Sequence, residues 1–273
     1  MLPILGIIAG NGELPHEINQ IYNEIGGKCV VAYIGKEDKP WNIKYQNFAI
    51  GSVGNILKYF NEQNVKNIII VGSIDRPNLK SLKVDLVGSS LLAKIMKMKF
   101  LGDDNILRIV SDFIESKGFK VISPQQILKS YDYEKNMITK ISPSSQNLTD
   151  INLGCTILRS LGSVDVGQSV IMCNGYTLGI EAAEGTDNLI KRCAILRKIN
   201  KGGVLVKMHK FNQDIRLDTP TIGPQTIINL SENGFNGIAI DKQNVLIVQP
   251  KETLKLLNDK KLFLAFVSVE HIT

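Results

Sequence analysis

The chain has 273 residues, of which 44% are hydrophobic and 21% are charged, a balance typical of globular proteins, and its length suits two domains better than one. Its formal net charge of +6 favours an anionic partner. The Lys and Arg residues are spread along the chain without a long basic tail, so we do not expect a nucleic-acid partner.

The longest apolar runs argue against membrane insertion. None approaches the roughly 20 residues that a transmembrane helix needs. The apolar start of the chain has no basic segment before it and breaks at Gly10-Asn11-Gly12, unlike a signal peptide. We therefore expect a cytoplasmic protein.

Apolar runs alternate with amphipathic patterns through the first half of the chain. The sequence predicts strands at 4–9, 29–34, 65–71 and 119–122, and helices at 13–25, 53–63 and 103–116. The run VKNIIIV at 65–71 is apolar on both faces, as in a sheet that helices cover on both sides. The alternation predicts an α/β fold, with a Rossmann-like N-terminal domain and a mainly parallel sheet over residues 1–130.

A polar stretch at 131–150 contains Ser-Pro-Ser-Ser and is interpreted as a linker. Asn174-Gly175 lies between two apolar runs and predicts an antiparallel hairpin. The pattern predicts further helices at 151–161, 188–197, 224–233 and 252–258, and strands at 169–173, 177–182, 203–208, 238–240, 245–248 and 263–267. We therefore expect residues 151–273 to form a mixed-sheet α/β catalytic domain.

A glycine-rich turn, Gly10-Asn11-Gly12, follows the first predicted strand. Glycines let the backbone approach a phosphate, and the free N–H groups of the next helix attract anions. The dinucleotide fingerprint is incomplete, because Pro15 stands where its third glycine belongs. A tight turn without a ligand explains these residues equally well.

Two further positions in the first half carry candidate groups. Arg76 follows the strand at 65–71, where it could bind a phosphate or pair with Asp75 to fix the turn. Asp103 and Asp104 start a helix, where one carboxylate caps the free N–H groups. The pair could also help to hold Mg²⁺, which prefers oxygen ligands.

The second half has two polar loops after predicted strands. In the first, Thr186 or Asp187 would cap the next helix, whereas Glu184 has no such role and is the better site candidate. In the second, residues 207–223 combine basic and acidic side chains. Cations for phosphate oxygens and carboxylates for a metal ion or a general base converge in this loop.

The second loop, within VLVKMHKFNQDIRLDTPTIG, resembles the signature of the LpxI-type UDP-2,3-diacylglucosamine pyrophosphatases of lipid A biosynthesis. The blocks LGIIAGNGELP, GSIDRP, GDDNILRIV, DVGQSVIMCNG and EAAEGTDNLI also resemble this family, in the same order. The resemblance implies two domains that hold the lipid product between them. It also implies Mg²⁺-dependent hydrolysis to UMP and 2,3-diacylglucosamine 1-phosphate (lipid X).

The essential aspartate of the family matches Asp218, although Thr219 replaces the usual Leu beside it and Asn11 replaces a usual Gly. Asp218 is accordingly predicted to be the catalytic residue, as a metal ligand or a water activator. Further predicted Mg²⁺ ligands are Asp214, Glu184, Asp103 and Asp104, and predicted substrate-binding residues are Gly10, Asn11, Gly12, Arg76, Lys207, Arg216, Thr221 and Gly223. The expected partner is a UDP-linked acylated sugar, and the resemblance leaves open peripheral contact with the inner membrane and a homodimer.

Two other functions remain as alternatives. A nucleotide-cofactor oxidoreductase needs an acidic residue about 20 positions beyond the glycine turn, and Glu37 is a late match. A non-catalytic carrier of lipids or nucleotide sugars would also explain a basic protein with a cleft. Hydrolysis of the substrate would separate an enzyme from a carrier.

Overall fold

The computed structural model describes residues 2–36, 42–74, 77–79, 81–98, 103–128, 133–162, 166–197, 201–210, 214, 216–217 and 219–268, without the side chains of 103, 104, 133 and 134. The chain forms two compact units. The N-terminal unit comprises Met1–Ser130 and Asp214–Asp218, and the C-terminal unit comprises Tyr131–Gln213 and Thr219–Thr273. Within the described part of the chain, no helix is long and apolar enough to cross a membrane.

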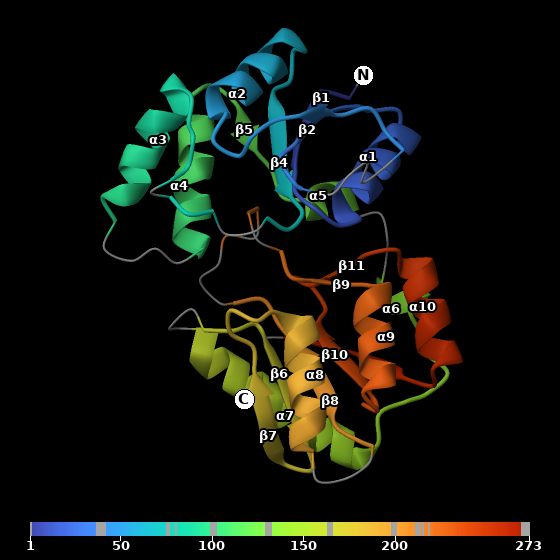
Figure 1. Ribbon diagram of the computed structural model, residues 1–273. Coiled ribbons are helices and arrows are strands. Elements are labelled where there is room, and N and C mark those ends of the chain that lie inside the picture. Colours follow the sequence, from blue (N-terminus) through green and yellow to red (C-terminus); the bar gives the residue numbers. More distant parts are fainter. Residues whose placement is uncertain are drawn as a thin grey trace. The chain divides into compact units, whose positions relative to one another are not determined.

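The N-terminal unit is built around a sheet of five parallel strands in the order β3-β2-β1-β4-β5 (Figure 1). Its elements are β1 (Ile4–Ala9), α1 (Leu14–Glu24), β2 (Lys28–Tyr33), β3 (Gln46–Asn47), α2 (Val53–Glu62), β4 (Asn67–Val71), α3 (Leu86–Met96), α4 (Asp103–Glu115), β5 (Lys120–Val121) and α5 (Gln125–Leu128). The predicted Rossmann-like parallel sheet is confirmed. The strand order reverses between β1 and β4, and open α/β sheets bind ligands at such a switch point.

Helices cover both faces of this sheet. Helices α2, α3 and α4 pack on one face, where Phe60 and Ile114 contact a cluster that includes Ile68 of β4. Helices α1 and α5 lie on the opposite face (Figure 1). Full burial of each such side chain contributes about 1.5–3 kcal/mol, so the apolar strands fix the position of the switch point.

Helix α3 was not predicted from the sequence. It starts after Asp85, whose carboxylate accepts a hydrogen bond of 2.7 Å from the backbone N–H of Gly88. This N-cap satisfies one of the free amides at the helix start. In the sequence, the Asp directly before Leu86-Val87 therefore indicates the start of this helix.

The C-terminal unit contains a mixed five-stranded sheet in the order β12-β10-β8-β6-β7. Its elements are α6 (Tyr133–Asn136), α7 (Ser145–Gly162), β6 (Ser169–Cys173), β7 (Tyr176–Ile180), α8 (Thr186–Leu196), β8 (Val204–Lys207), β9 (Thr221–Ile222), α9 (Pro224–Glu232), β10 (Gly237–Asp241), β11 (Leu246–Ile247), α10 (Pro250–Asp259) and β12 (Phe263–Val267). Strands β8, β10 and β12 are parallel, and β6 is antiparallel to both β7 and β8. The mixed sheet is thereby confirmed.

The predicted hairpin joins β6 and β7. Asn174 and Gly175 have φ angles of 52° and 81°, the left-handed conformation that this tight turn needs. The buried carboxylate of Asp150 accepts hydrogen bonds from both of their backbone N–H groups, at 2.9 and 2.6 Å. Asp150 therefore anchors the turn to α7.

Helix α7 begins six residues before the predicted start at 151. The hydroxyl of Ser144 accepts from the Asn147 N–H at 3.2 Å, and the Asn147 side-chain oxygen accepts from the Ser144 N–H at 3.1 Å. This reciprocal cap starts the helix inside the polar stretch that was interpreted as a linker.

Helices cover both faces of the C-terminal sheet (Figure 1), and each face has its own hydrophobic core. Helix α7 packs on one face through Ile151 and Cys155 against β6 and β8. Helices α8, α9 and α10 pack on the other face, against residues that include Ile171 and Leu205. The short strands β9 and β11 form a separate parallel pair.

Candidate functional site

The switch point of the N-terminal sheet is closed by the backbone of the glycine-rich turn. The Gly10 N–H donates to Val71 O at 2.8 Å, and Asn11 exchanges two backbone hydrogen bonds with Ser73, at 2.8 and 3.0 Å. The backbone N–H groups of Gly10 and Asn11, two of the predicted substrate-binding residues, therefore have partners within the fold. Gly12 follows with a φ of 96°, and a side chain there would meet open space.

Asn11 ties this turn to the end of β2. Its side-chain oxygen accepts from the Tyr33 hydroxyl at 2.8 Å and from the Lys36 N–H at 3.0 Å. The residue that departs from the family's usual glycine thus links the carboxyl ends of β1, β2 and β4. Helix α1 then starts without a side-chain cap, so the turn leads into the amide-rich end of a helix.

The C-terminal unit gathers polar side chains at the end of β8. Lys207 is only 5% exposed, and its ammonium donates to the hydroxyl of Thr186 at 2.9 Å. That hydroxyl donates to the carboxylate of Glu181, also at 2.9 Å. A lysine predicted from the loop therefore lies in a buried hydrogen-bonded chain that also contains Thr186 and Glu181.

Ser169 begins β6, the strand next to β8, and Glu181 directly follows β7 on the other side of β6. Ser169 pairs with Lys207 in the sheet, and the Glu181 N–H donates to Ser169 O at 2.8 Å. Cross-strand partners point to the same face of a sheet. We call Glu181, Ser169, Lys207 and Thr186 the polar row. Among the described residues, Glu181 Oε2 and Ser169 Oγ have no hydrogen-bond partner although both are buried.

Glu184 lies outside this buried chain. Its carboxylate forms an ion pair of 2.6 Å with Arg192 and accepts a hydrogen bond of 3.0 Å from the Ala182 N–H. The hydrogen bond from Arg192 is the main reason that the pKa of Glu184 is lowered. Before it could bind a metal ion, Glu184 would have to release Arg192. The N-cap of α8 is Gly185 rather than Thr186 or Asp187, so the predicted cap was wrong.

Asp214 and Arg216 belong to the N-terminal unit. The Arg216 guanidinium holds both oxygens of Asp214, with its shortest hydrogen bond at 2.7 Å, and also contacts Glu115 at 3.2 Å. The side-chain hydrogen bond between the two residues lowers the pKa of Asp214 and raises the pKa of Arg216. A predicted metal ligand and a predicted phosphate ligand are therefore paired with each other.

Thr221 and Gly223 lie on the short strand pair and the helix that follows it. Thr221 is in β9 and pairs with Leu246 of β11. Gly223 is the N-cap of α9, and no side chain caps this helix. The two residues thus lead into a second helix start with free amides, the kind of position where phosphates bind.

Several predicted groups lie outside the described residues. These are the residues Asp218, Arg76 and Glu37, together with the side chains of Asp103 and Asp104. Among the side chains that the structure does describe, no group of three or more His, Cys, Asp and Glu is placed to hold a metal ion.

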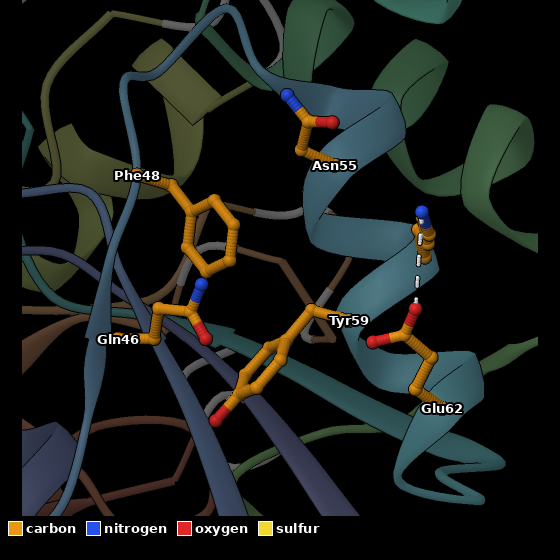
Figure 2. Close-up of a pocket in the computed structure, with 6 residues that line it drawn as sticks. Gln46, Phe48, Asn55, Tyr59 and Glu62 are labelled. Atoms are coloured by element: carbon orange, nitrogen blue, oxygen red, sulfur yellow. Dashed lines mark ion pairs between the residues drawn. The ribbon is translucent and has the colours of Figure 1, made fainter.

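A shallow pocket of about 380 Å³ lies between β3 and α2 (Figure 2). Phe48 and Tyr59 line it with their ring centroids 5.6 Å apart. Its charged residues, Lys58 and Glu62, pair with each other at 3.9 Å, and both are largely exposed. This pocket contains no residue that the sequence singled out, and we assign no chemistry to it.

The fold and these sites define a protein of two α/β units, each with polar groups at the carboxyl ends of sheet strands. The models of the LpxI N-terminal and C-terminal domains match residues 4–131 and 134–265. UDP-2,3-diacylglucosamine pyrophosphatase LpxI of Caulobacter vibrioides is 30% identical over 267 residues, which cover 95% of each chain. The chain belongs to the LpxI family.

Proposed function

We propose that this protein hydrolyses the pyrophosphate of UDP-2,3-diacylglucosamine in lipid A biosynthesis. Water adds to one phosphorus, the bridging P–O bond breaks, and the products are UMP and 2,3-diacylglucosamine 1-phosphate. The observation that carries the proposal is the similarity over 95% of both chains to a relative named for this activity. The domain models support it, because they match both units in order.

The polar row suits a diphosphate ligand. Negative charge on the phosphoryl oxygens repels a nucleophile, and a fixed cation offsets this charge without reorganisation during the reaction. Lys207 supplies such a cation, held at the end of β8. The residue therefore stays our candidate for binding the phosphate oxygens.

We assign the catalytic role to Asp218 from its match to the family's aspartate. Asp218→Asn should lower kcat for UMP release by at least about 100-fold while the folded fraction stays unchanged, since the substitution removes a charge from the reacting centre. The experiment combines purified protein with UDP-2,3-diacylglucosamine and measures UMP over time. An unchanged rate in this variant would refute the assignment.

The wild-type protein decides between an enzyme and the alternatives. Substrate that binds but releases no UMP would favour a carrier. Binding of NAD(P)H at micromolar concentration, measured by fluorescence, would favour an oxidoreductase instead. Rapid UMP release without cofactor binding supports the hydrolase.

We also propose a requirement for Mg²⁺. When bound, the ion would neutralise phosphate charge and activate water. Asp218, Asp103 and Asp104 remain the proposed ligands, whereas the described side chains of Asp214 and Glu184 are each paired with an arginine. Removal of divalent ions with a chelator should abolish UMP release, and Mg²⁺ should restore it.

The acyl chains of the substrate further suggest that the protein works in the cytoplasm at the surface of the inner membrane.

A further inference from the structure

The arrangement of hydrogen bonds around Thr186 has only one possible direction. An ammonium group has donors and no acceptor, so Lys207 must donate to the Thr186 hydroxyl. The hydroxyl has one proton, which it gives to Glu181 Oε1. The carboxylate of Glu181 thus orients the hydroxyl, and the hydroxyl accepts a hydrogen bond from the Lys207 ammonium.

The three hydrogen-bonded residues come from three separate segments of the polypeptide. Glu181 follows β7, Thr186 is the first residue of α8, and Lys207 ends β8. The backbone bond from Glu181 to Ser169 O sets the register that brings these segments together. The exposed fractions of Glu181 and Lys207 are only 6% and 5%, so solvent screens the arrangement weakly.

Two polar atoms of the row have no partner within the described structure. Glu181 Oε2 and Ser169 Oγ are buried without a hydrogen-bond partner among the described residues. A buried polar atom without a partner destabilises a fold, because it has lost its hydrogen bonds to water. An apolar residue at position 169 would avoid this cost.

We infer that Glu181 is a positioning residue for Lys207, acting through the hydroxyl of Thr186. The inference rests on the proposed function, in which Lys207 faces the phosphoryl oxygens of the substrate. A flexible lysine must lose the freedom of its long side chain each time it binds, whereas a fixed lysine has lost this freedom on folding. Glu181 and Thr186 thus act on the transition state without contacting the reacting atoms.

The test compares Glu181→Gln, Thr186→Val and Thr186→Ser. The first two variants should lower kcat for UMP release by about 10- to 100-fold and change KM by less than about threefold, because positioning matters most as charge develops. Thr186→Ser keeps the hydroxyl and should stay within about threefold of wild type. The double variant Glu181→Gln/Thr186→Val should be no worse than either single variant, since both break one chain.

Asp150→Asn is the matched control. Asp150 is also a buried carboxylate of the C-terminal unit, but it holds the turn at the opposite end of the β6–β7 hairpin. This variant should lose stability and keep the wild-type kcat in its folded fraction. If Glu181→Gln behaves like Asp150→Asn, or if Thr186→Ser is as impaired as Thr186→Val, the inference is wrong.

A second measurement does not depend on hydrolysis. NMR relaxation of the labelled Lys207 side chain, assigned with Lys207→Arg, reports its order directly. The order should fall in Glu181→Gln and Thr186→Val but not in Asp150→Asn. A wild-type protein that releases no UMP would refute the proposed function alone, whereas unchanged order of Lys207 in both variants would refute the positioning role.

Discussion

The two units place polar groups at the carboxyl ends of their strands in opposite ways. At the switch point of the N-terminal sheet, the Gly10 N–H donates to Val71 O, and Asn11 and Ser73 exchange two backbone hydrogen bonds. In the polar row of the C-terminal unit, Glu181 and Ser169 each keep a buried oxygen without a partner in the described structure. The backbone groups of the turn are thus paired within the fold, whereas two buried oxygens of the polar row are not.

The comparison shows that the topology of a sheet and the presence of unpaired polar groups indicate different places for a binding site. Topology alone points to the switch point as a binding site, because open α/β sheets bind ligands there. The unpaired oxygens of Glu181 and Ser169 indicate the polar row instead, because buried polar groups are almost always paired unless they have another role. We therefore expect changes in the row to affect activity and changes in the turn to affect stability.

The largest effect should come from Lys207→Met, which keeps the length of the side chain and removes its charge. Loss of a fixed cation at the phosphate should lower kcat for UMP release by about 100-fold or more. The control is Lys58→Met, since Lys58 is exposed on α2 and should leave kcat unchanged. Equal activity of the two variants would break the comparison.

An intermediate effect, on stability, should come from Gly10→Ala. A methyl group there would lie 2.8 Å from the backbone carbon of Gly72 and would also meet Ser73 O, so the two strand ends must separate. We expect a loss of about 2–3 kcal/mol in the free energy of unfolding in urea. Gly12→Ala meets open space and only the strain of a positive φ, so its loss should be nearer 1 kcal/mol. A larger loss for Gly12→Ala would contradict the closed turn.

The smallest effect concerns Asp214 and its dependence on pH. The hydrogen bond from Arg216 lowers the pKa of Asp214 in the folded protein. The ionised carboxylate therefore stabilises the fold above the unfolded pKa of about 3.9, and this contribution is lost as pH falls through the lower folded pKa. Asp214→Asn should cost about 0.5–1 kcal/mol at pH 7 and progressively less below pH 4, measured by urea unfolding. A difference that does not change with pH would show that the charge of Asp214 is not involved.

Local patterns were sufficient to predict most of the fold. The alternation of apolar strands and amphipathic helices predicted the parallel sheet, and Asn174-Gly175 predicted the hairpin with its two positive φ angles. The starts of α3 and α7 were missed, although Asp85 and Ser144 carry capping signals. Both helix starts are marked by capping residues rather than by hydrophobic periodicity, on which the predictions were based.

The candidate site was less accessible, because it depends on register between distant segments. Glu181 and Glu184 are three residues apart in one loop, and nothing local tells which is buried. The pairing of β6 with β7 and β8 buries Glu181 beside Lys207, whereas Glu184 meets Arg192 at the surface. Sequence reasoning chose Glu184 because it had no capping role, and it could not see this pairing.

The return of residues 214–218 to the N-terminal unit makes that unit discontinuous in the chain. Leu217 is buried in its core, and Arg216 contacts Glu115 of α4. A fragment that stops at residue 130 would thus lack part of its own interior. The polypeptide passes from one unit to the other three times, so the N-terminal unit cannot be transferred to another protein as one continuous segment.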